Sequence, residues 1–177
     1  MKTLILLLCT LVLSNTYAKS FKLKDSKGSS VIKMSDDWTY LKDSMGLPHV
    51  FVSKGENPNS TLSITHVDIK ELKLDPKKLA KTQEVYQDGR KRWAKKRKIE
   101  IITFTKYVNF KNRNKVNFHV VGLKYKLNEN NFLEKSYYAE CKKKLVHLKS
   151  VVFYKHLELG KQLLDSVDNF RCQYPIQ

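Results

Sequence analysis

The stretch "VNFHVVGLKYKLNENNFLEKSYYAE", residues 116–140, decides the fold. It contains two runs rich in apolar, β-branched and aromatic residues, 116–127 and 132–140, joined by the short polar connection "NENN". Runs of this kind are typical of β-strands, and so short a connection brings the second strand back antiparallel to the first. The sequence therefore predicts an antiparallel strand pair over residues 116–140.

Two further strand candidates flank this pair. The run 100–108 precedes it, after which "NFKNRN" supplies another polar connection, and the run 145–154 follows it. In 145–154 the residues of both alternating faces are largely apolar, which indicates a central strand covered on both sides. The four runs together predict an antiparallel meander.

The residues before the meander contain shorter strand candidates and one long helix candidate. The strand runs are 21–24, 30–34, 49–53 and 62–67, with turn compositions at 46–48 and 55–60. Asp75 and Pro76 make a good helix start, and Leu79, Tyr86 and Trp93 then recur every seven residues. This spacing predicts a helix over 76–97 with one apolar face, in which Gly89 is a point where a kink can form.

A second helix is predicted over 157–170, because Leu163, Val167 and Phe170 share one face. Strands, a long helix, a meander and a terminal helix make an α+β domain with an antiparallel sheet flanked by helices.

Several landmarks occur in the order found in a known group of proteins. Trp38 followed by "GLPHVFVS", then "STLSITHV", the long helix, and "FLEKSYYAEC" before a closing helix resembles the Mog1/PsbP-like group, including the bacterial DUF1795 proteins. The resemblance implies an α/β/α sandwich built on an antiparallel sheet. It also implies a binding, assembly or accessory role, and it supplies no shared catalytic motif, so no site residues are transferred.

The first eighteen residues have the pattern of a secretory signal peptide. Lys2 precedes the apolar run 4–13, and small and polar residues lead to Ala18. We expect cleavage after Ala18, which leaves one domain over 19–177 and places the protein in the periplasm or outside a bacterial cell. The chain has a net charge of +17, which becomes +16 when Lys2 is removed, and such a charge favours anionic partners.

Cysteine usage agrees with export. Cys9 lies in the expected signal peptide, so the exported chain keeps Cys141 and Cys172. Two cysteines in an exported protein most simply pair, and we expect this bridge to join the last helix to the sheet. Neither cysteine belongs to a CxxC pair, so the sequence predicts no cysteine metal site.

The segment "RKRWAKKRK", residues 90–98, is the candidate binding site. Trp93 continues the apolar face of the predicted helix, and the charged residues either form a solvated surface or bind an anionic partner. The candidate partner-binding residues are Arg90, Lys91, Arg92, Lys95, Lys96, Arg97 and Lys98. An acidic protein or an anionic envelope component is favoured as partner over nucleic acid, because no nucleic-acid-binding module with exposed aromatic residues is visible.

The sequence favours binding over catalysis. No HExxH, GxSxG, phosphate-binding loop or GxGxxG pattern occurs, and no cofactor or metal is predicted. His66 and Asp68 could form a base and its orienting carboxylate, although an ordinary strand histidine is the favoured interpretation. His147 is expected to be a hydrogen-bonded core or boundary residue. The alternative function is a basic secreted nuclease or hydrolase, with His66, His119 and Lys149 as candidate residues, or a nonspecific nucleic-acid-binding protein.

Overall fold

The computed structural model describes residues 18–55, 59–68, 75–142 and 144–173. The expected signal peptide, apart from Ala18, lies outside the described residues. The strands before the long helix are β1 (Ala18–Lys24), β2 (Ser29–Ser35), β3 (Trp38–Ser44), β4 (Leu47–Ser53) and β5 (Thr61–Asp68). The later strands are β6 (Glu100–Phe104), β7 (Val108–Lys111), β8 (Asn117–Leu127), β9 (Asn130–Cys141), β10 (Lys144–Phe153) and β11 (Arg171–Gln173). The helical elements are η2 (Pro76–Lys78), α1 (Gln83–Arg97) and α2 (Leu157–Asn169).

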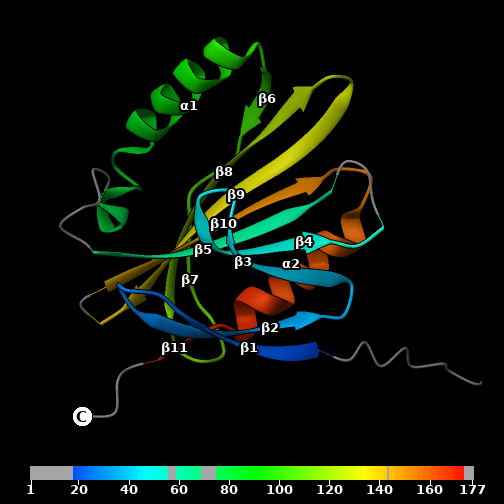
Figure 1. The fold of residues 1–177 in the computed structure, drawn as a ribbon. Helices are drawn as coiled ribbons and strands as arrows, with labels where there is room; N and C mark the ends of the chain where they lie inside the picture. The colour runs from blue at the N-terminus through cyan, green and yellow to red at the C-terminus, as the bar shows by residue number, and fades with distance from the viewer. Residues whose placement is uncertain (1–17, 56–58, 69–74, 143, 174–177) are drawn as a thin grey trace, which may run out of the picture.

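The predicted meander forms one side of a large antiparallel sheet, from its central strand to one edge. Its strand order is β3-β4-β5-β10-β9-β8-β6, with β7 also paired to β8 (Figure 1). β10 pairs with β9 on one side and β5 on the other, so the predicted central position of this strand is confirmed. The predicted single strand 100–108 is instead two short strands, β6 and β7, which pair with successive parts of β8 on either side of residues 105–107.

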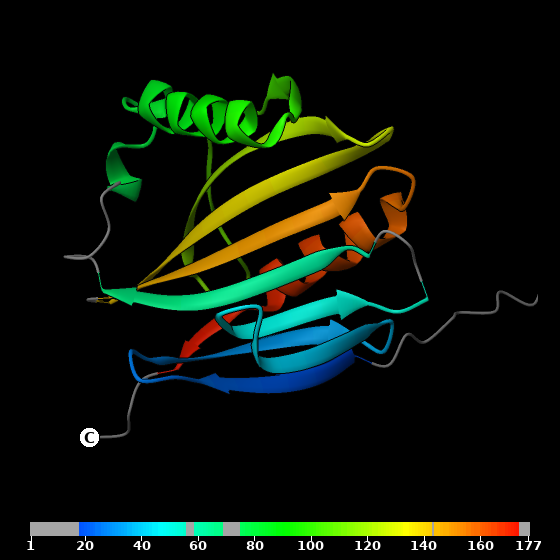
Figure 2. The ribbon, with the colours of Figure 1, turned by 45° about the horizontal axis from the view of Figure 1, so that its top comes forward.

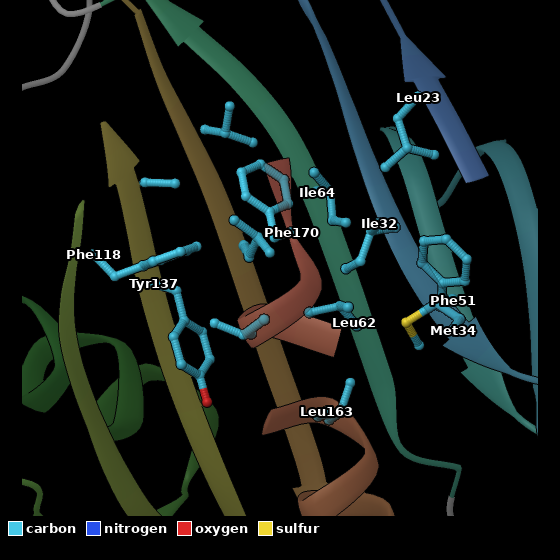
Figure 3. Close-up of a cluster of buried hydrophobic side chains, with 14 of the residues drawn as sticks. Leu23, Ile32, Met34, Phe51, Leu62, Ile64, Phe118, Tyr137, Leu163 and Phe170 are labelled. Atoms are coloured by element: carbon cyan, nitrogen blue, oxygen red, sulfur yellow. The ribbon is translucent and has the colours of Figure 1, made fainter. Parts of the chain in front are cut away.

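A second, three-stranded sheet packs on one face of the large sheet. Its order is β1-β2-β11, and its Leu23 and Ile32 belong to the same buried cluster as Leu62 and Ile64 of β5 in the large sheet (Figure 3). α2 covers the same face, where Leu163 is almost fully buried. This layer contains the main hydrophobic core of the protein.

The opposite face of the large sheet carries α1. Tyr86 packs against both smaller hydrophobic clusters on this face, and Trp93 meets Tyr125 of β8 edge to face, with ring centroids 5.7 Å apart. Figure 2 shows α1 along the β6 and β8 end of the sheet, away from the β1–β2 hairpin. The predicted orientation of Tyr86 and Trp93 toward the sheet is therefore confirmed.

The predicted helix over 76–97 is divided. Asp75 caps the short 3-10 helix η2 by accepting a hydrogen bond from the backbone of Lys77, and α1 begins only at Gln83. The break lies at residues 79–82 and not at Gly89, which lies within a continuous α1. Because the helix is divided here, the side chain of Leu79 packs in the small cluster with Val121, Tyr138 and Leu145.

The predicted disulfide is present. Cys141 at the end of β9 is bonded to Cys172 in β11, and their Cα atoms are 5.6 Å apart. Cys141 belongs to the large sheet, and Cys172 belongs to β11 of the small sheet, the short strand that follows α2. It is a covalent link between the large and small sheets in addition to their shared core.

Candidate functional site

The cations of "RKRWAKKRK" lie on α1 but do not share one environment. Arg90 points toward the sheet, where its Nη2 lies 2.8 Å from Oε2 of Glu134, a carboxylate with a side chain only 3% exposed. Lys149 of β10 approaches the same oxygen at 3.2 Å. The Arg90 guanidinium also lies over the Trp93 ring, 3.8 Å from its centre. Arg90 is therefore engaged within the protein.

The buried Glu134 charge affects the aromatic residues around it. Burial raises the pKa of Tyr86, and the neighbouring Glu134 charge raises it further. Burial and Glu134 act in the same way on Tyr125 and raise its pKa to about 12. Both phenols therefore stay neutral at physiological pH, and Arg90 and Lys149 are the groups that compensate Glu134.

The six remaining cations of the segment are exposed: Lys91, Arg92, Lys95, Lys96, Arg97 and Lys98. Lys91 is paired with Asp88 on the same helix at 3.2 Å. Along the part of the chain that the structure describes, the other five form no ion pair. We call these six residues the α1 basic surface.

A cluster of histidines lies on the other side of the large sheet. Asp25 in the β1–β2 turn, His49 in β4 and His66 in β5 bring their ligand atoms within 4.8 Å of one another. His66 Nδ1 lies 2.6 Å from Asp25 Oδ2, and His66 Nε2 lies 3.1 Å from the Ser30 hydroxyl. Both ring nitrogens of His66 are thus engaged, and the considered pairing of His66 with Asp68 does not form.

His119 forms a separate group on the α1 side of the sheet. Its Nε2 lies 2.6 Å from Glu140 Oε1, and its Nδ1 lies 2.7 Å from the Tyr107 hydroxyl. Burial favours the neutral acid at Glu140, but hydrogen bonds from His119 and Asn117 outweigh it and lower the pKa of this carboxyl. His119 is therefore held at both nitrogens by neighbouring side chains.

A pocket of about 300 Å³ opens beside Glu140. Its lining residues are Asp75, Pro76, Lys77, Glu140, Lys142, Lys144 and Leu145. Lys77 Nζ lies 3.9 Å from Glu140 Oε2, so part of the positive lining is already compensated. The pocket combines cations with carboxylates and has no strong preference for one sign of charge.

The structure does not bring the candidate nuclease residues together. His66 pairs in register with Val146, whose side chain belongs to the main core, and it faces the small sheet. His119 pairs with Tyr138, on the face that carries α1, where Lys149 also contacts Glu134. Two acid–base groups and a cation around one phosphate would need these side chains on one face.

Sequence reasoning missed the Asp25–His49–His66 cluster. Asp25 belongs to a turn, and the two histidines are on neighbouring strands, so no fixed spacing in the sequence connects them. One signal could have found them. His49 is two residues from Phe51, and His66 is two residues from Ile64, so each histidine occupies the inward face of a strand where an apolar residue is expected.

Comparisons with known proteins give the fold. The sequence matches no protein-family model and no curated protein. The structure is similar to the solution structure of PsbP from the cyanobacterium Synechocystis, with 14% identity and a TM-score of 0.57 over 90% of this chain and 96% of that chain. It is also similar to LpqN, a Mycobacterium tuberculosis protein involved in cell envelope biogenesis, with 12% identity and a TM-score of 0.57 over 89% and 92% of the two chains.

These likenesses confirm the predicted α+β fold and its resemblance to the Mog1/PsbP-like group. At such low identity they show the fold alone, and no site residue is transferred from either protein. Among the described helices, none has the length and apolar character needed to cross a membrane.

Proposed function

We propose that this protein is an exported, non-catalytic binding or accessory protein of the bacterial envelope, with the α1 basic surface as its site for an acidic partner. The observation that carries the proposal is the concentration of six exposed cations within residues 91–98. Acidic partners here are an acidic protein or an anionic envelope component. The similar fold of LpqN, a protein of cell envelope biogenesis, supports the envelope role.

The α1 basic surface has an energetic cost in the free protein. Lys91 and Lys95 are four residues apart on the helix, as are Arg92 and Lys96, and like charges at this spacing destabilise a helix by about 0.2–0.5 kcal/mol per pair. Cations in the last turn recover part of this cost from the helix dipole. A partner that supplies carboxylates or phosphates would relieve the remaining repulsion, which favours a binding role.

The Cys141–Cys172 disulfide supports export, because such bonds persist in oxidising compartments. We therefore also propose that the exported form begins at Lys19, after cleavage behind Ala18. N-terminal sequencing of the protein recovered outside the cytoplasm tests this step. A chain that retains residues 1–18 would contradict it.

The binding proposal is tested by charge reversal that leaves Arg90 intact. Changing Arg90 to Glu would place a second carboxylate beside Glu134 and damage the fold, so the variant is Lys91→Glu/Lys95→Glu/Lys96→Glu. The matched control is Lys22→Glu/Lys24→Glu/Lys33→Glu, which reverses exposed lysines of β1 and β2 and changes the net charge by the same amount.

Each protein is immobilised and exposed to envelope extract of the producing bacterium at physiological ionic strength. We expect the wild type and the control variant to retain the same partner and the α1 variant to lose it. Equal loss in the two variants would show that binding depends on net charge alone. Equal retention by the two variants would show that the α1 basic surface does not bind the partner. Circular dichroism of all three proteins verifies that the fold is kept.

A further inference from the structure

The Asp25–His49–His66 cluster lies where the two sheets meet. Asp25 belongs to the turn between β1 and β2 of the small sheet, whereas His49 and His66 belong to β4 and β5 of the large sheet. The two imidazole rings are T-shaped, with their centroids 6.1 Å apart. Two imidazole nitrogens and one carboxylate thus converge from three separate segments.

His49 has an unused nitrogen that is directed into this cluster. Its side chain is 1% exposed, and its Nε2 has no hydrogen-bond partner among the described residues. The nearest carboxylate oxygen, Asp25 Oδ2, is 4.0 Å away, which is too far for a hydrogen bond. A buried polar nitrogen without a partner destabilises the fold, and a ligand bound at His49 Nε2 would offset this cost.

The outer nitrogens of both histidines are fixed by hydroxyl groups. His49 Nδ1 lies 2.8 Å from the Tyr40 hydroxyl, and His66 Nε2 lies 3.1 Å from the Ser30 hydroxyl. When each of these nitrogens donates its hydrogen to the hydroxyl, His49 Nε2 and His66 Nδ1 present lone pairs to the centre of the cluster. This is the arrangement that orients histidine ligands around metal ions.

Asp25 is held in place as the third ligand. Its Oδ1 accepts hydrogen bonds from the backbone N–H groups of Lys27 and Gly28, which leaves Oδ2 directed at the histidines. Burial on its own raises the pKa of Asp25, but the hydrogen bonds from His66 and from the turn outweigh it and lower the pKa. Burial lowers the pKa of His49.

We propose that Asp25 Oδ2, His49 Nε2 and His66 Nδ1 bind a divalent transition metal ion of the zinc class. Ligands about 2.0 Å from a tetrahedral ion lie about 3.3 Å from one another. The two measured separations from Asp25 Oδ2, 2.6 Å and 4.0 Å, fall on either side of that value. The two histidine nitrogens lie within 4.8 Å of each other, so binding needs the side chains to close in on the ion, which takes the place of the proton between His66 and Asp25.

The ion would join the β1–β2 turn to β4 and β5 and would leave a fourth position for water. Asp25 is 14% exposed and gives the ion access from solvent. Two nitrogens and one oxygen suit Zn²⁺, whereas Mg²⁺ and Ca²⁺ prefer a shell of oxygens. The site is distinct from the α1 basic surface, which lies on the other side of the large sheet.

The test is a titration of the tag-free protein with Zn²⁺, measured by calorimetry. We expect one ion per chain and affinity at least about 10-fold weaker in Asp25→Asn and in His49→Gln. Asp25→Asn keeps the acceptor for the turn hydrogen bonds. The matched control is His119→Gln, which alters a buried histidine that also contacts a carboxylate but lies outside the cluster. Its affinity for Zn²⁺ should equal that of the wild type, and Mg²⁺ should not bind at the concentration that saturates Zn²⁺.

A second measurement uses the wild type alone and so does not depend on the folding of any variant. Zn²⁺ should shift the imidazole nitrogen resonances of His49 and His66 in NMR spectra and leave those of His119 and His147 in place. Absence of stoichiometric binding, or Zn²⁺ shifts confined to other histidines, would overturn the proposal. Equal affinity in wild type, Asp25→Asn and His49→Gln would overturn it as well.

Discussion

His147 is a partly buried histidine in the large sheet whose imidazole the fold keeps neutral. Its ring stacks on Tyr138, with centroids 4.7 Å apart and planes 6° from parallel, and its Nε2 has no hydrogen-bond partner among the described residues. Burial, assisted by the Lys149 charge, lowers the pKa of His147 to about 4. The expectation of a hydrogen-bonded core histidine is therefore wrong at Nε2, because the stacked ring occupies an apolar position.

This pKa predicts a loss of stability in acid. Below pH 6.5 the unfolded chain binds a proton at His147 that the folded protein does not accept until about pH 4. The group thus supports folding above pH 6.5, and up to about 3 kcal/mol is lost as the pH falls to 4. His147→Phe keeps the stack on Tyr138 and cannot be protonated.

Urea denaturation of wild type and His147→Phe between pH 7 and pH 4 measures this contribution. The free energy of unfolding of the variant minus that of the wild type should increase as the pH falls. Asp25, His49 and Glu140 titrate in both proteins, so their contributions cancel in the difference. A difference that stays constant over this range would show that His147 takes up its proton as readily in the folded protein as in the unfolded chain.

Arg90 shows why residue roles on the basic helix could not be predicted from sequence. "RKRWAKKRK" contains seven cations with the same local pattern, and helical spacing placed Trp93 correctly against the sheet. The partner of Arg90 is Glu134, 44 residues away in the chain. The partner of His66, Asp25, is likewise distant, at 41 residues. Such pairs depend on how the elements pack against one another, and the local periodicity of the sequence carries no information about that packing.

Two glycines in separate elements have opposite reasons for their positions. Gly89 lies inside α1, and a side-chain Cβ added there would meet no atom within 4 Å. Gly122 lies in β8, and a Cβ there would be 2.3 Å from the backbone oxygen of Glu134 in β9. The helix thus tolerates a side chain at its glycine, and the sheet does not.

The Gly89→Ala and Gly122→Ala pair makes this difference measurable. Gly89→Ala should raise the free energy of unfolding by up to about 1 kcal/mol, because alanine restricts the unfolded chain and is the best helix former. Gly122→Ala should lower it by roughly 1–3 kcal/mol, because backbone atoms must move to accept the methyl group. Urea denaturation at pH 7 measures both. A destabilised Gly89→Ala would mean that α1 requires glycine for a contact absent from the structure.

The elements that sequence predicted well are those with a clear period and long flanking signals. β8, β9, β10 and α2 agree with their predicted ranges to within about two residues. β3 was missed because it is an edge strand whose residues are mostly exposed, so it lacks an apolar alternation. β11 was missed because three residues carry no period, and it forms by pairing with β2.

At the scale of the whole molecule, two links hold the small sheet against the large one. The main core contains residues from β1, β2 and α2 as well as from β4, β5 and the meander. The Cys141–Cys172 bond adds a covalent link from β9 to β11. The predicted bridge from sheet to terminal helix thus reaches the small sheet, because the chain pairs with β2 immediately after α2.

The bond closes a loop between residues 31 positions apart, and in the chain-entropy model this loop stabilises the fold by roughly 3–4 kcal/mol. The free energy of unfolding of the double variant Cys141→Ala/Cys172→Ala should therefore be lower by that amount, so the variant should unfold at a lower urea concentration. The main core remains, so the variant should still fold with the same far-ultraviolet circular dichroism. The slope of the transition should increase, because the unfolded chain without the bond is more expanded and exposes more surface.

Reduction of the wild type supplies the control, because it removes the same bond without changing a side chain in the core. Wild type in dithiothreitol should approach the double variant in its free energy of unfolding, and the variant should not respond to the reductant. If reduction had no effect on the wild type, the core shared by the two sheets would hold them together alone. In that case the bond would not contribute to stability. The fold would then not depend on an oxidising compartment, and one support for export would be lost.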